Sequence, residues 1–165
     1  MSPVTIITDS SAYLPAELVA RYPIQVIPLT LNWDDQTYRD GVDIQASEFY
    51  QRLSNSKTIP TTSQIPADEL QKKIKQLLAA GQDVLILPIS SGISGTYQTA
   101  SGVVEEFSTE QVALLDTKLV SMALGFQVLA AARLAAAGAS LAECKQAAQQ
   151  AYDQIGVYFI VDTLK

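Results

Sequence analysis

The sequence predicts an α/β fold: a mostly parallel sheet with helices on both faces. Short apolar runs rich in branched residues alternate with longer segments of helical periodicity along the 165 residues. The most apolar run, Val84–Ile89, indicates a strand buried on both faces. Polar residues follow the runs, as expected where parallel strands end at one edge of a sheet. Chain length and a hydrophobic content of 48% fit one domain with its own core.

The first half of the chain contains three predicted strands and three predicted helices before the central strand. A strand over residues 4–8 ends at polar residues, and Pro15 begins a short helix, where proline's missing N–H costs nothing. A second strand over 24–33 contains Pro28, which places it at an edge or a bulge. The other elements expected here are a hairpin strand at 37–41, a helix at 45–53, a polar loop at 54–64 and a helix at 66–80.

The second half continues the alternation of strands and helices. After the central strand we expect a helix at 95–107 and a strand at 112–115 that ends at Asp116. Gly138 and Ser140 are typical of a helix stop followed by a new N-cap. The last expected elements are helices at 119–137 and 141–155 and a closing strand at 157–161.

The loop after the central strand is the strongest candidate for a binding site. Its residues 90–96 offer four hydroxyls and two glycines, and glycine lets backbone approach a ligand closely. A helix N-terminus directly behind the loop favours an anion. The competing interpretation is that Ser94 is only the N-cap of that helix. We expect a small anionic group to bind here. The hydroxyl-bearing residues are Ser90, Ser91, Ser94 and Thr96, and the glycines are Gly92 and Gly95.

Charge and composition exclude several classes of partner. The net charge is −6, and the only cluster of basic residues, Lys72, Lys73 and Lys75, fits the solvated face of a helix. Nucleic acid binding, which needs a concentrated basic face, is therefore not expected. Residues 119–137 contain Gln127 and Arg133 and are rich in alanine, so we expect a buried helix and no membrane span. A lone Cys144 and the lack of a signal peptide predict a cytoplasmic location.

Common catalytic and cofactor motifs are missing from the sequence. The chain has no histidine, so a Ser-His-Asp arrangement and histidine metal sites cannot form within it. Gly92 to Thr96 only approaches the G-x-S-x-G elbow, and no Walker or dinucleotide fingerprint occurs. Asp9 and Asp116 at strand ends could hold a divalent metal, but such residues more often cap turns. We expect no cofactor and no metal.

Five segments, in order along the chain, resemble the motifs of the DegV family. Together they span nearly the whole sequence and are far more specific than a single glycine-containing loop. They are Thr8-Asp9-Ser10-Ser11 with Leu14-Pro15, Thr62-Ser63-Gln64, Ile89 to Gln98, Leu115-Asp116-Thr117-Lys118 with Ser121-Met122, and Phe159 to Leu164.

The resemblance implies a bacterial protein that binds a long-chain fatty acid such as palmitate and does no chemistry itself. In family members that serve a fatty-acid kinase, the lipid is presented to that separate enzyme, which phosphorylates its carboxylate. The acyl chain lies in an apolar tunnel, and hydroxyls at the mouth hold the headgroup. Carried over by motif, the ligand-binding residues are Thr62, Ser94 and Gly95, with Ser63 and Ser91 beside them.

The resemblance also implies a second lobe, with a Gly-Gly-Arg motif and a histidine near the headgroup. We expect residues 1–165 to be the N-terminal lobe, with the second lobe absent from this chain. Two competing interpretations stay open. One is an enzyme acting on a small phosphorylated or acyl substrate at the Ser90–Thr96 loop. The other is a protein-docking module, in which the face left by the missing lobe pairs two copies as a homodimer.

Overall fold

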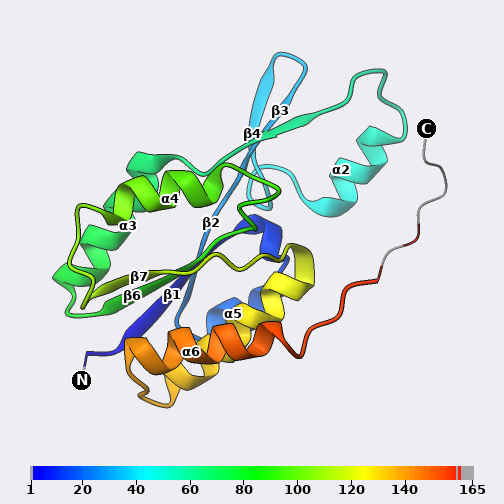
Figure 1. The fold of residues 1–165 in the computed structure, drawn as a ribbon. Helices are drawn as coiled ribbons and strands as arrows, with labels where there is room; N and C mark the ends of the chain where they lie inside the picture. Colours follow the sequence, from blue (N-terminus) through cyan, green and yellow to red (C-terminus); the bar gives the residue numbers. More distant parts are fainter. Residues whose placement is uncertain (1, 159, 161–165) are drawn as a thin grey trace.

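A parallel four-stranded sheet forms the centre of the molecule (Figure 1). The computed structural model describes residues 2–158 and 160. The strands lie in the order β2-β1-β6-β7, and every neighbouring pair is parallel. Their carboxyl ends therefore share one edge, as the sequence predicts. The strands are β1 (Val4–Asp9), β2 (Ile24–Ile27), β6 (Asp83–Leu87) and β7 (Val112–Leu114).

Helices cover both faces of this sheet, which confirms the predicted fold class (Figure 1). Adjacent residues of β1 show why both faces are apolar: Ile6 packs into one core and Ile7 into the other, and both are buried. Leu85 and Ile86 of β6 divide in the same way. One face carries α1 (Ala16–Arg21), α5 (Ser121–Ala136) and α6 (Leu141–Tyr152), and the other carries α3 (Ala67–Ala79) and α4 (Thr96–Val104).

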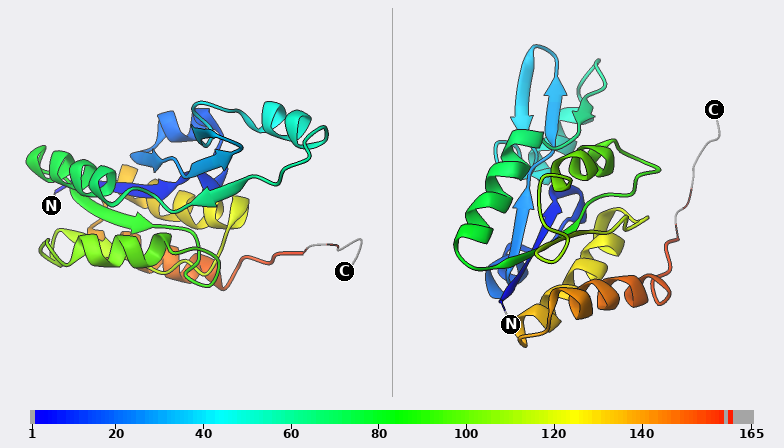
Figure 2. Two further views of the ribbon diagram at one scale, coloured as in Figure 1. Left: turned by 90° about the horizontal axis from the view of Figure 1, so that it is seen from above. Right: turned by 60° about the vertical axis from the view of Figure 1, so that its left-hand side comes forward.

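A smaller antiparallel sheet lies beyond the carboxyl ends of the parallel strands (Figure 2). Its strands, in the order β4-β3-β5, are β3 (Thr30–Trp33), β4 (Gln36–Arg39) and β5 (Thr61–Ser63). Helix α2 (Ala46–Leu53) covers it, and the buried Trp33 stacks edge-on against Phe49 at 5.3 Å between ring centroids. This sheet carries one of the two predicted hydroxyl segments to the edge where the parallel strands end.

Two predictions in this region are wrong. Residues 24–33 form two strands of different sheets, because Pro28 lacks the N–H that a continuous ladder needs and the chain turns there. The prediction that this segment lies at an edge is correct for its first part, since β2 is an edge strand of the parallel sheet. The predicted loop at 54–64 contains β5, whose partner β3 is far away in sequence and supplies the pairing.

The prediction of a closing strand at 157–161 is also wrong for the residues of this segment that the structure describes. Residues 157, 158 and 160 lie outside any strand, while 159 and 161 lie outside the described residues. Tyr158 and Ile160 are almost fully exposed, so no neighbouring strand packs on them. Within the described part of the chain, no helix is both long enough and apolar enough to span a membrane.

Candidate functional site

Two carboxylates hold the loops together at the edge where the parallel strands end. Asp9, at the end of β1, accepts hydrogen bonds from Ser11 N–H (3.0 Å) and, across the sheet, from Ile89 N–H (2.7 Å). Asp116, after β7, accepts the Ser91 hydroxyl at 2.6 Å and the Ser91 N–H at 3.1 Å. Each carboxylate therefore ties its own loop to the loop that follows β6. This is the turn-capping role predicted as the commoner one.

Ionisation of these two carboxylates is shifted in opposite directions. Burial raises the pKa of Asp9, and the hydrogen bonds from Ser11 and Ile89 offset this only in part. Burial also opposes ionisation of Asp116, but hydrogen bonds from Ser91 and from Lys118 N–H outweigh it and lower the pKa of that carboxyl. Among residues 2–158 and 160 no three His, Cys, Asp or Glu side chains gather as a metal site would require.

The loop after β6 presents Ser94 directly before helix α4. The Ser94 hydroxyl accepts the Thr96 N–H at 3.2 Å and lies 3.0 Å from the buried Thr96 hydroxyl. Ser94 therefore makes one hydrogen bond of the kind that an N-cap residue makes, which is the competing interpretation of this serine. The N-cap residue of α4 is Gly95, which makes no side-chain cap. The positive end of the helix dipole consequently faces the loop.

Strand β5 brings the second hydroxyl segment to this loop. A Cβ added at Gly95 would collide with the Oε1 atom of Gln64, the residue after β5. Gln64 therefore lies against Gly95, and the absence of a side chain there allows it. The structure brings the segment 62–64 and the loop 90–95 together at this contact.

The three residues of β5 face in different directions. Thr62 pairs with Leu31 on β3 and shares its side of the small sheet, whereas Ser63 pairs with Thr30 on the opposite side. The Ser63 hydroxyl accepts a hydrogen bond from Asn32 Nδ2 at 3.0 Å. Of the two, Thr62 lies on the same side of the small sheet as the buried Leu31, although Thr62 itself stays exposed.

A cavity of about 220 Å³ lies on the Thr62 side of β5. We name it the Thr62 cavity, and its wall is largely apolar and aromatic. Ser94 is not one of its lining residues, but Ile89, just before the serine loop, is. Six of the lining residues are Tyr13, Leu31, Phe49, Tyr50, Thr62 and Ile89.

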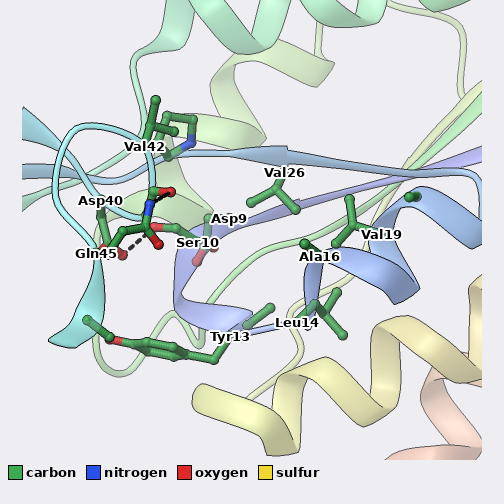
Figure 3. A pocket seen from close by; sticks show the side chains of 15 residues that line it. Asp9, Ser10, Tyr13, Leu14, Ala16, Val19, Val26, Asp40, Val42 and Gln45 are labelled. Atoms are coloured by element: carbon green, nitrogen blue, oxygen red, sulfur yellow. Dashed lines mark hydrogen bonds between the residues drawn. The ribbon is translucent and has the colours of Figure 1, made fainter.

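A second cavity, of about 540 Å³, lies between β2, α1 and the loop after β4 (Figure 3). We name it the Val26 cavity. Asp40, Ser10 and Tyr13 lie at one end in Figure 3, and the apolar side chains of Val26, Ala16 and Val19 lie at the other. The Ser10 hydroxyl donates to Asp40 Oδ2 at 2.7 Å.

Sequence reasoning missed Gln64 and Tyr13 as members of this region. Gln64 belongs to the quoted Thr62-Ser63-Gln64 motif, but its position against Gly95 depends on the pairing of β5 with the distant β3. Tyr13 adopts a left-handed backbone, with φ of +50°, at the end of the 3₁₀ turn η1 (Ser10–Ala12). No local pattern signals such a conformation in a tyrosine.

Comparison with known proteins identifies related chains over nearly the full length. Residues 3–165 match the family model "Uncharacterised protein, DegV family". A DegV domain-containing protein of Clostridium perfringens is 35% identical over 146 residues, which are 88% of this chain and 52% of that protein.

Solved structures agree with this assignment. A DegV family protein from Thermus thermophilus, described for its fatty acid binding, superposes with a TM-score of 0.83 at 32% identity over 92% of this chain and 54% of that one. DegV from Bacillus subtilis, described as a fatty acid binding protein, gives 0.84 at 29% identity over 93% and 55%. The chain spans about half the length of these relatives. With five motifs in order, the matching family model and these two structural neighbours, the chain belongs to the DegV family.

Proposed function

We propose that this chain binds a long-chain fatty acid, with its carboxylate held by the hydroxyls of Thr62 and Ser94 and its tail in the Thr62 cavity. The contact between Gln64 and Gly95 carries this proposal, because it joins the two hydroxyl segments beside an apolar cavity. The structural relatives from Thermus thermophilus and Bacillus subtilis, described as fatty acid binding, support the same ligand class.

The environment of Ser94 suits an anionic headgroup. When the Thr96 hydroxyl and N–H both donate to Ser94, the Ser94 proton is left to donate outward. A hydrogen bond to a carboxylate is about twice as strong as one between neutral groups. The N-terminus of α4 adds a favourable field at the same place, and the N-cap residue Gly95 has no side chain that would fill it.

The tail is expected to supply most of the affinity. The Thr62 cavity is lined by Leu31, Phe49 and Ile89, and each methylene transferred from water to such a wall contributes about 0.8 kcal/mol. Each hydrogen bond from a hydroxyl to the charged carboxylate contributes about 1.5–3 kcal/mol.

We assign Ser91, Ser63 and Gly95 to supporting roles in this site. The Ser91 hydroxyl donates a hydrogen bond to Asp116 and so fixes the loop that presents Ser94. Ser63 accepts from Asn32 on the outer side of β5, which anchors the strand that presents Thr62. Gly95 leaves room for Gln64.

Binding of palmitate to the purified chain tests the proposal. Thr62→Val and Ser94→Ala remove one hydroxyl each, and each is expected to weaken binding at least tenfold in a fluorescent fatty acid displacement assay. Matched controls are available, because Thr61 lies on the other side of β5 and Ser101 lies within α4. Thr61→Val and Ser101→Ala should bind as wild type does. Equal effects of Thr61→Val and Thr62→Val would contradict the assignment.

Native mass spectrometry of protein purified from bacterial cells tests the ligand class independently. A bound mass of fatty-acid size supports the proposal. Wild-type protein that neither carries nor takes up palmitate would contradict it.

We further propose that the carboxylate is presented to a separate fatty-acid kinase, in line with the family resemblance. Ser94→Ala should then abolish phosphate transfer to the bound lipid by that partner, and retained transfer would count against the role of Ser94. A cytoplasmic location and the pairing of two copies stay predictions. Cell fractionation tests the location, and light scattering tests whether two copies pair.

A further inference from the structure

The Thr62 cavity and the Val26 cavity share three lining residues. Tyr13, Asp40 and Ala46 line both the Thr62 cavity and the Val26 cavity. At about 220 Å³ the Thr62 cavity is smaller than most pockets that enclose an organic ligand, whereas the Val26 cavity, at about 540 Å³, falls within the usual range. A long acyl chain that starts at Thr62 therefore needs the space beyond these three residues.

Among the three, Tyr13 has the largest side chain, and the backbone of Tyr13 is fixed by its surroundings. Its φ of +50° is uncommon for a non-glycine residue and is held by the N–H bond to Ser10 O at 3.1 Å at the end of η1. The preceding Ala12 is buried against α5, where Gly125 leaves room for its carbonyl. The side chain of Tyr13 is half-exposed, so the ring is less constrained than the backbone that carries it. Partial burial, together with Asp40 and Tyr50 nearby, raises the pKa of the phenol, which agrees with its place between the two cavities.

The charge at this junction sets the direction in which a fatty acid enters. Asp40 lines both cavities and is held by the Ser10 hydroxyl. A second carboxylate beside it is disfavoured by like-charge repulsion. The end of the Val26 cavity away from Asp40 is apolar, as Val26, Ala16 and Val19 show in Figure 3. The tail of the ligand, and not its head, therefore suits this passage.

We propose that Tyr13 divides the acyl-chain site into a near part, the Thr62 cavity, and a far part, the Val26 cavity, and so determines which chain lengths are preferred. This inference rests on the proposed fatty acid binding and specifies its selectivity. Short chains end before the Tyr13 ring. Longer chains must pass it to reach the far cavity.

Affinity for laurate and stearate, measured on the same protein by displacement of a fluorescent fatty acid, tests this proposal. Tyr13→Asn removes the ring and keeps a residue that tolerates the left-handed backbone. Each methylene newly buried is worth about fourfold in affinity, so the preference for stearate over laurate should rise at least tenfold. Tyr13→Trp should lower that preference, and Tyr13→Phe should leave it unchanged. Tyr152→Asn, at the end of α6 and away from both cavities, is the matched control.

The outcomes separate this inference from the proposed function. Wild-type protein that binds neither laurate nor stearate would overturn the fatty acid binding itself. Wild-type protein that binds both, with the same preference in Tyr13→Asn and Tyr13→Trp, would overturn the role of Tyr13 alone. Because Tyr13→Trp keeps an aromatic residue at this position, it decides the question even if Tyr13→Asn does not fold.

Discussion

Replacement of Gly95 by alanine separates the proposed binding role of this loop from its role in stability. The backbone at Gly95 has φ of −70° and ψ of −1°, which alanine adopts without strain. Alanine also reduces the entropy of the unfolded chain, which favours folding by about 0.4–1 kcal/mol. The added Cβ collides with the tip of Gln64, which is flexible and can turn away. The free energy of unfolding should therefore change by less than about 1 kcal/mol.

Fatty acid binding should respond far more strongly. When the tip of Gln64 turns away, the contact that joins the Thr62 segment to the Ser94 loop is lost, so the two hydroxyls are no longer held at the spacing that one carboxylate needs. Loss of one of the two hydrogen bonds to the carboxylate costs about 1.5–3 kcal/mol. This corresponds to a rise in Kd of roughly tenfold to a hundredfold.

A double-mutant cycle with Gln64→Ala measures whether this contact is the cause. Palmitate affinity by fluorescent displacement and unfolding by urea are recorded for wild type, both single variants and the double variant. In the Gln64→Ala background the alanine at position 95 meets no side chain tip, so it should cost little further affinity. An equal loss of affinity in both backgrounds, or none in either, would refute the reasoning.

Two further predictions concern the packing and the buried charge beneath the site. Gly125→Ala places a Cβ 2.8 Å from the Ala12 carbonyl oxygen and should destabilise the protein by about 1–3 kcal/mol in urea unfolding. The control Gly102→Ala, in α4, places a Cβ that meets nothing within 4 Å and should not destabilise the protein. Equal free energies of unfolding for the two variants would contradict this prediction. Because the pKa of Asp9 is raised, the folded state binds the proton of this carboxyl more tightly than the unfolded chain does. Protonation of Asp9 therefore stabilises the fold fully below the ordinary pKa of 3.8, and this stabilisation is lost as pH rises through the pKa of the folded state. The free energy of unfolding of wild type minus that of Asp9→Asn should therefore fall as pH rises above about 3.8, and a rise or a flat difference would refute the sign.

The parallel sheet and its helices were predictable because their signals are local. The apolar residues of β1 and β6 are buried on both faces, so each strand is visible as a continuous run, and the helices between them show their own periodicity. The edge shared by the polar loops follows from parallel strand order alone. Strand β5 was missed because its three residues are all exposed and polar, and only its partner β3 makes them a strand.

The candidate site was predictable in its chemistry but not in its geometry. The hydroxyls of Thr62 and Ser94 could be named from their motifs, since residue types in a row are visible in a sequence. That Gln64 reaches Gly95 depends on a pairing between residues about thirty positions apart. The position of Tyr13 between the two cavities depends on a left-handed backbone that tyrosine seldom adopts, so the sequence contains no local signal for this position.

The central claim is that two distant hydroxyl segments hold one carboxylate, and a crystal structure of the palmitate complex tests it most directly. We predict that both Thr62 Oγ1 and Ser94 Oγ lie within about 3 Å of the carboxylate oxygens, the usual hydrogen-bond distance for hydroxyl donors. The acyl chain should run from there into the Thr62 cavity. A carboxylate bound in the Val26 cavity beside Asp40, with the tail towards Thr62, would contradict the claim.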